Sequence, residues 1–195
     1  MAGYRTYIDG TRSGPVVPVD RPEEAAMAIN RGRYSAGAGA DGTVLFLIGM
    51  RINRVWQVWK WLPVFAAMPR MIAELMKDRS LGMVGRPRTF LSGRTILVWQ
   101  YWASFEQLEA YAKSTTAAHL PAWRSFNRHV RDNGSVGIFH ETIVLSDATV
   151  ETVYGNMPTM GLAAVTGAVP ASQRGQSARA RITGADTGTP PVEPY

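Results

Sequence analysis

Histidine is the residue type in this chain best suited to chemistry, because the sequence contains three histidines and no cysteine. An imidazole can bind a metal ion or exchange a proton near neutral pH. His119, His129 and His140 show no metal-site spacing with one another or with a carboxylate, so a mononuclear zinc or iron site made of side chains is not expected. Without cysteine, this sequence has no disulfide framework, no thiolate metal site and no cysteine nucleophile.

His140 has both a structural and a functional explanation. In the stretch that surrounds it, alternate residues share one face, so His140 is expected beside Ile138 and Thr142, whereas Glu141 points the other way. There His140 is either a hydrogen-bonded structural residue or, if that face lines a site, a ligand or an acid–base group. His129 is expected on the surface of a helix.

Composition limits the classes of protein and of partner. A chain of 195 residues that is 46% hydrophobic can bury one core. The net charge of +6 comes from scattered arginines without a nucleic-acid-binding motif, so no nucleic-acid partner is expected. The most apolar stretch, 44–75, is interrupted by four basic residues, which argues against a spanning segment and a membrane partner. We therefore expect a cytoplasmic protein.

The elements that must position these residues follow from hydrophobic spacing. Apolar residues at intervals of three and four predict a helix over 61–75, with Pro63 in its first turn and a kink at Pro69. Ser104 and Gln107 have capping-box spacing, so another helix is expected to begin there. A further helical piece is expected near 121–133. Alternating or apolar runs predict strands at 43–52, 81–91, 95–102 and 136–145.

This order, β-α-β-β-α-β, predicts an α+β, ferredoxin-like fold, in which helices cover one face of an antiparallel sheet. The strand at 95–102 is apolar on both faces, with Trp99 on one and Trp102 on the other. The face without helices therefore needs a cover, and a second copy of the same sheet would provide it. The sequence predicts a homodimer with the architecture of a dimeric α+β barrel.

Three regions are expected along the chain. Residues 1–41 are rich in turn formers and read as an N-terminal arm. Residues 42–163 are expected to form the barrel domain, with a C-terminal strap at 157–160. Residues 164–195 are expected to be a flexible tail, because their composition cannot offset the entropy of ordering.

The sequence contains the segments Gly49-Met-Arg-Ile-Asn-Arg54, Lys60-Trp-Leu-Pro-Val-Phe65, His119-Leu-Pro-Ala-Trp-Arg124 and Gly137-Ile-Phe-His-Glu-Thr142. With others, they resemble a bacterial monooxygenase-like family of the dimeric α+β barrel superfamily, which includes an oxygenase type of the fumagillin pathway. The resemblance covers roughly residues 29–162. It implies an oxidative enzyme that acts on a small hydrophobic or aromatic molecule, within secondary metabolism. The superfamily holds cofactor-free monooxygenases, haem enzymes including aldoxime dehydratases, and non-catalytic members, so the cofactor stays open.

One pattern within the resemblance points to haem. Haem-degrading members carry a tryptophan at a strand end, a helix-capping serine two residues later, an aromatic residue on that helix, and a proximal histidine seventeen residues past the tryptophan. Trp102, Ser104, Tyr111 and His119 occupy similar positions. The resemblance thus implies His119 as the axial ligand of a haem iron, with Trp102, Tyr111 and Trp123 as further haem contacts. Alternatively, His119 is a helix-flanking residue bonded to backbone.

Asn53, Gln100 and His140 are the candidate catalytic residues. Haem-degrading members use an asparagine on the first strand, and Asn53 ends that strand here, where it could instead cap the next helix. Cofactor-free members hold an easily deprotonated substrate with a few polar groups in an apolar pocket, and Gln100 or Tyr101 could be such a group. A module that binds a hydrophobic ligand or haem without turnover is the alternative to an enzyme.

Overall fold

The computed structural model describes residues 28–118, 126, 134–146, 148–175 and 177–184. Its larger part is a four-stranded antiparallel sheet with the strand order β3-β4-β2-β5. The strands and helices follow one another as β-α-β-β-α-β, which confirms the predicted ferredoxin-like α+β fold. The elements are β2 (Val44–Ile52), α2 (Val58–Lys77), the short 3-10 helix η1 (Arg79–Leu81), β3 (Met83–Ser92), β4 (Thr95–Trp102), α3 (Phe105–Lys113) and β5 (Val136–Val144).

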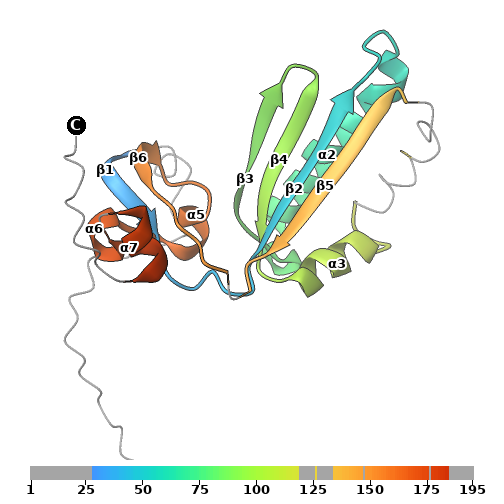
Figure 1. Ribbon diagram of the computed structural model, residues 1–195. Helices are drawn as coiled ribbons and strands as arrows, with labels where there is room; N and C mark the ends of the chain where they lie inside the picture. Colours follow the sequence, from blue (N-terminus) through green and yellow to red (C-terminus); the bar gives the residue numbers. More distant parts are fainter. Residues whose placement is uncertain (1–27, 119–125, 127–133, 147, 176, 185–195) are drawn as a thin grey trace, which may run out of the picture.

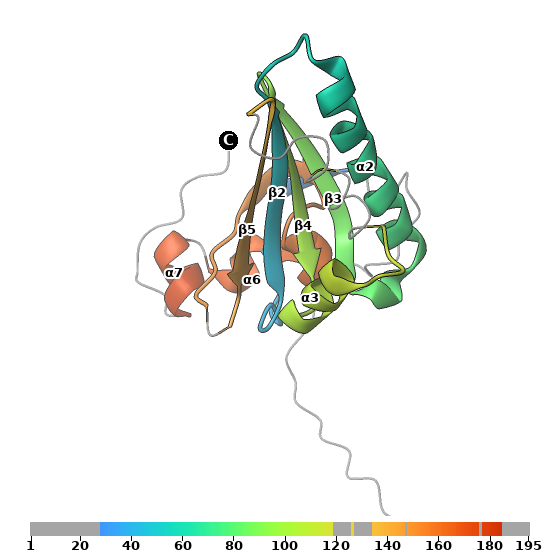
Figure 2. The same cartoon turned by 90° about the vertical axis from the view of Figure 1, so that its right-hand side faces the viewer.

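Both helices, α2 and α3, cover the same face of this sheet (Figures 1 and 2). The predicted cap of α3 is confirmed, because the Ser104 hydroxyl accepts a hydrogen bond from the Gln107 amide at 3.3 Å. Helix α2 begins earlier than predicted, at Val58, so Pro63 lies inside the helix and not in its first turn. The helix is preceded by a backbone turn in which the Gln57 amide donates a hydrogen bond to the Arg54 carbonyl. Such a turn has no hydrophobic periodicity, so the sequence pattern did not show where the helix begins.

Strand register divides the sheet residues between two faces. On the face covered by helices, Ile48 pairs with Val98 of β4 and with His140 of β5. On the opposite face, Leu47 pairs with Trp99 and with Glu141. The predicted alternation of His140 and Glu141 is therefore confirmed.

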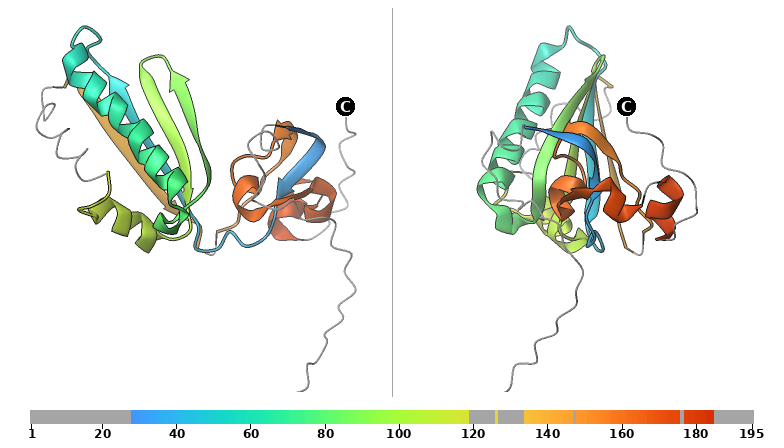
Figure 3. Two further views of the ribbon diagram at one scale, coloured as in Figure 1. Left: turned by 180° about the vertical axis from the view of Figure 1, so that it is seen from behind. Right: turned by 90° about the vertical axis from the view of Figure 1, so that its left-hand side faces the viewer.

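A second, three-stranded sheet with the order β6-β1-β7 forms a smaller lobe. Figures 2 and 3 show the lobe on the side of the large sheet opposite α2. Tyr34 stacks on Tyr154 with ring centroids 4.9 Å apart, and Tyr101 of β4 packs against this cluster. The lobe contains β1 (Ile29–Ala36), β6 (Tyr154–Pro158), α5 (Ala163–Thr166), β7 (Ala168–Pro170), α6 (Ala171–Arg174) and α7 (Ala178–Thr183).

Within the described residues, the lobe replaces part of the expected arm at 1–41 and part of the expected flexible tail at 164–195 with ordered elements, whereas residues 1–27 and 185–195 lie outside them. Residues 29–36 and 168–170 are strands that pair with each other, and 29–36 also pairs with the strap. On α7, Arg181 forms a 2.6 Å ion pair with Glu151. Each segment alone is too polar or too rich in glycine to form a core, and only their association buries Tyr34 and Ala36.

The lobe also covers one end of the sheet face that the sequence assigned to a second copy. A Cβ at Gly161 would lie 3.4 Å from the Trp99 ring, so the chain passes close to that face. Farther along, Phe90 is 43% exposed and Phe139 is 38% exposed. The homodimer stays a prediction. Among the described residues, no helix is long and apolar enough to cross a membrane.

Candidate functional site

A cavity of about 550 Å³ lies between the large sheet and helices α2 and α3. Its wall is mainly apolar, with phenylalanines and methionines from both helices and the sheet. Thr89, Glu109, His140 and Thr142 are the polar residues of this wall. An apolar cavity with few polar groups is the usual form of a small-molecule site. The aromatic and sulfur-containing wall residues are Phe46, Phe65, Phe105, Phe126, Met50, Met68 and Met71.

Helix α2 supplies the roof of the cavity through one of its faces. Val64, Ala67, Met68, Met71 and Ile72 recur at intervals of three and four and line the space. The methyl side chain of Ala67 is too short to fill the distance to the sheet, so volume remains beneath the helix. The neighbouring methionines are flexible, which allows the wall to adapt to different ligand shapes.

His140 enters the cavity from β5, an edge strand of the sheet. Its ring lies 5.8 Å from the Phe46 ring, with the planes tilted by 40°. Thr142 lines the cavity from the same face, two residues along the strand. The His140 side chain is also exposed, so the imidazole can reach solvent while it contacts a bound molecule. His140 is therefore the described residue best placed for acid–base chemistry.

Thr89 stands at the opposite edge of the same cross-strand row. Register joins Thr89 to Val98, Val98 to Ile48 and Ile48 to His140. Three strand spacings separate the two polar residues, or about 14 Å. Polar groups thus border an apolar centre at both edges of the sheet. Sequence reasoning missed Thr89, because only the strand register places it in this row.

Gln100 is buried and lies next to the cavity, opposite Phe46 in the strand register. Its side-chain oxygen accepts a hydrogen bond from the indole Nε1 of Trp102 at 3.1 Å. The amide oxygen is therefore already engaged with the protein. The structure places Gln100 as a partner of Trp102 beneath the wall.

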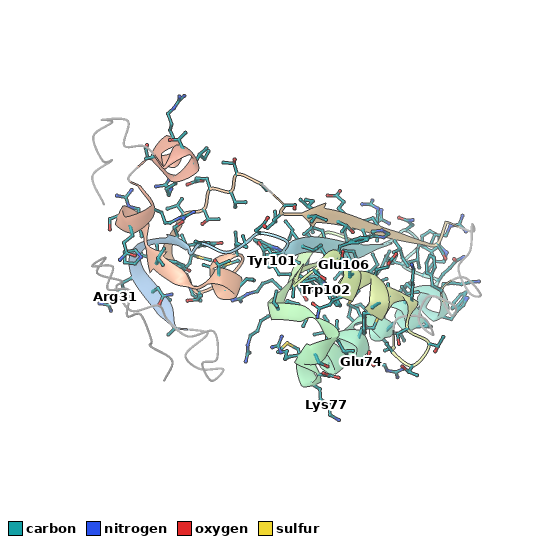
Figure 4. All side chains as sticks on the ribbon, turned by 90° about the horizontal axis from the view of Figure 1, so that it is seen from below. Arg31, Glu74, Lys77, Tyr101, Trp102 and Glu106 are labelled. Atoms are coloured by element: carbon teal, nitrogen blue, oxygen red, sulfur yellow. The ribbon has the colours of Figure 1, made fainter. Side chains whose placement is uncertain are left out.

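Trp102 and Tyr111 pack against each other in the core, with ring centroids 5.6 Å apart. Trp102 is only 1% exposed. The Tyr111 hydroxyl donates a 2.8 Å hydrogen bond to Glu74 of α2, and burial together with this carboxylate raises the pKa of Tyr111. In Figure 4, Trp102 and Glu74 lie on the helix side of the sheet, whereas Tyr101 lies toward the lobe. The two expected haem contacts are thus core residues, outside the cavity wall.

Asn53 lies beyond the end of β2 and apart from the cavity. Its side-chain oxygen accepts a 3.1 Å hydrogen bond from Arg51, which belongs to the face opposite the helices. The N-cap of α2 is Gln57, so Asn53 does not cap that helix. His119, Trp123 and His129 lie outside the described residues. Within the described ranges, no three histidine, aspartate or glutamate residues gather as a metal site.

A family model described as monooxygenase af470-like matches residues 43–162, more than half of the chain. The chain belongs to the monooxygenase af470-like family. This assignment confirms the family resemblance found in the sequence, and the matched range contains every element that forms the cavity.

A curated protein of this family, Monooxygenase af470 from Aspergillus fumigatus, is 28% identical over 138 residues. The alignment covers 64% of this chain and 46% of that protein, so the chain spans about half the length of its relative.

Solved structures of aldoxime dehydratases share the fold. One, in complex with butyraldoxime, has a TM-score of 0.55 at 20% identity and covers 70% of this chain and 40% of that chain. Another has a TM-score of 0.52 at 20% identity and covers 74% and 47%.

Proposed function

We propose that this member of the monooxygenase af470-like family is an oxidative enzyme that acts on a small hydrophobic molecule in the cavity beneath α2. The presence of His140 in the wall of a mainly apolar cavity is the observation that carries this proposal. A site of this composition binds the apolar body of a substrate by burial and leaves a few polar side chains to act on it.

The geometry assigns complementary roles to the cavity residues. The phenylalanine and methionine side chains exclude water from the bound molecule, which strengthens every polar interaction inside. The His140 imidazole accepts a proton from an acidic C–H or O–H group of the substrate and can return it to solvent. Thr142 can donate its hydroxyl proton in a hydrogen bond to the same end of the substrate.

The residues of the cavity wall bear on whether the protein could bind haem. An imidazole in apolar surroundings is a donor that haem iron uses, and His140 offers one. This donor and the apolar wall support haem as a candidate cofactor, with His140 as the described ligand candidate and His119 as the candidate outside the described residues. A bound haem would supply oxygen or peroxide activation. Trp102 and Tyr111 would support its pocket from the core.

A cofactor-free reaction is the second candidate, and the apolar wall favours it as well. In that version the substrate itself reduces dioxygen after losing a proton to His140: a CH2 group becomes a carbonyl with one oxygen atom, and the other oxygen leaves as water with the two hydrogens. The apolar wall limits access of water to the anion. The same residues serve both versions, so the two differ in whether haemin is required for turnover.

The test is oxygen uptake with a panel of small hydrophobic and aromatic compounds, with product detection by mass spectrometry. The purified protein is assayed as isolated and after titration with haemin. The proposal predicts an oxygenated product in at least one arm. A compound that binds in the cavity and is always recovered unchanged would show a ligand-binding module instead.

A further inference from the structure

The first turns of helix α2, with the turn that precedes them, are apolar on the outer surface as well as on the face that lines the cavity. Trp56, in the turn before the helix, and Trp59, in its first turn, are each 67% exposed. A helix that is apolar all round is normally buried against something on each side. Here five large apolar side chains within eight residues face solvent. We call them the α2 outer face: Val55, Trp56, Val58, Trp59 and Leu62.

The part of the chain that carries the α2 outer face is basic. Between residues 53 and 73 it contains Arg54, Lys60 and Arg70 and no aspartate or glutamate, so this stretch carries three positive charges. Arg94, in the turn between β3 and β4, adds another, because its guanidinium donates a hydrogen bond to the Asn53 carbonyl at 3.1 Å. Exposed tryptophan within a basic surface is typical of proteins that bind at the water–lipid interface.

We propose that the α2 outer face docks on the surface of an anionic lipid bilayer. Tryptophan rings favour the depth of the lipid headgroups, and arginine and lysine are attracted to anionic lipids. A second copy of this chain fits less well, since a symmetric contact would bring the same basic residues together. The expectation of no membrane partner rested on the absence of a spanning segment, and peripheral docking needs none.

The docked face adjoins the proposed active site. Phe65 lies one helical turn after Leu62, is 41% exposed and also lines the cavity. The cavity therefore reaches the surface beside the α2 outer face. Docking would let an apolar substrate pass from the bilayer into the cavity past Phe65. This step, and no other part of the docking proposal, rests on the proposed function.

Co-sedimentation of the full chain with vesicles tests the docking. Phosphatidylcholine vesicles, with and without phosphatidylglycerol, are compared for the wild type and for the double variant W56S/W59S. We expect the wild type to bind vesicles that contain phosphatidylglycerol, with binding that weakens in high salt. The double variant should lose affinity on the order of tenfold or more, because both interfacial rings are gone. The matched control is Ile182→Ser, which changes an exposed apolar residue of α7 in the lobe and should bind as the wild type.

Three outcomes would overturn the docking proposal: no binding to anionic vesicles, equal binding by W56S/W59S, or a dimer in light scattering that dissociates in W56S/W59S. The last would show that the face contacts a second copy. Both substituted side chains are exposed, so thermal unfolding should be unchanged and a folding defect can be recognised. Vesicle binding needs no turnover. The docking proposal can therefore fail while the oxidative activity is found, and the activity can be absent while vesicle binding is found.

Discussion

Glu74 joins two elements beside the cavity, and it is the residue whose role is easiest to isolate. Its Oε2 atom accepts hydrogen bonds from the Tyr111 hydroxyl at 2.8 Å and from the Ala118 amide at 3.0 Å. Glu74→Ala leaves both donors without this acceptor and should lower the free energy of unfolding by about 1–3 kcal/mol. Chemical denaturation measures the change.

A double-mutant cycle with Tyr111→Phe sharpens this prediction. Because the two side chains share one hydrogen bond, their effects should be less than additive. Lys113→Ala is the control, since its ion pair with Glu109 is exposed and its loss should cost below about 1 kcal/mol. Additive effects of Glu74→Ala and Tyr111→Phe would contradict the coupling.

At the residue scale, the sequence predicted only part of the candidate site. His140 was placed on the correct face because strand alternation is a local rule, and that face lines the cavity. Asn53 and Gln100 were chosen by analogy and by polarity. In the structure Asn53 is hydrogen-bonded to Arg51 and Gln100 to Trp102, each two residues away along the chain. The sequence showed these neighbours but not that the side chains bond to each other.

At the element scale, close contact between β2 and its neighbours makes Gly49 a sensitive position. A Cβ there would lie 2.5 Å from the Ile96 carbonyl oxygen and 2.5 Å from the Phe139 ring. Gly49→Ala should therefore destabilise the sheet by about 1–3 kcal/mol, as overpacking does. Gly155→Ala is the control, because nothing lies within 4 Å of its Cβ position. Equal unfolding midpoints for the two variants would contradict this packing.

Elements with local signals were predicted well, and elements that depend on distant partners were not. Strands β2 to β5 and the Ser104 cap are set by alternation and by a four-residue motif, both visible in sequence. Strand β1 pairs with β6 and β7, more than a hundred residues away, and has weak hydrophobic character of its own. Its assignment to an arm followed from composition, which does not encode such pairing.

At the scale of the whole molecule, alkaline pH should weaken the contact between the sheet and the lobe. Burial, and to a smaller extent the nearby Tyr154, raises the pKa of Tyr101 from 10.0 to about 12. The unfolded chain then loses this proton first, so the contribution of Tyr101 to stability should be fully present below pH 10 and be lost as the pH rises from 10 to 12. Denaturation midpoints across that range should fall less steeply for Tyr101→Phe. Identical slopes for variant and wild type would contradict the assignment.

The sheet face beyond the lobe still predicts a homodimer. Phe90, 43% exposed, and Phe139 stand in the same cross-strand row of this face and are only partly covered by their own chain. Light scattering with size exclusion should give the mass of two chains, and Phe90→Asp should shift it to one by placing a charge in the contact. A wild-type monomer at high protein concentration would contradict the dimer.

The most direct test of the central claim compares the turnover of a compound identified in the oxygen-uptake panel by His140→Ala and Glu141→Ala. These neighbours lie on opposite faces of β5, and only His140 lines the cavity. His140→Ala should lower kcat about 10²- to 10⁴-fold with the compound still bound, as expected for loss of an acid–base group. Glu141→Ala should match the wild type. Full turnover by His140→Ala would contradict the account.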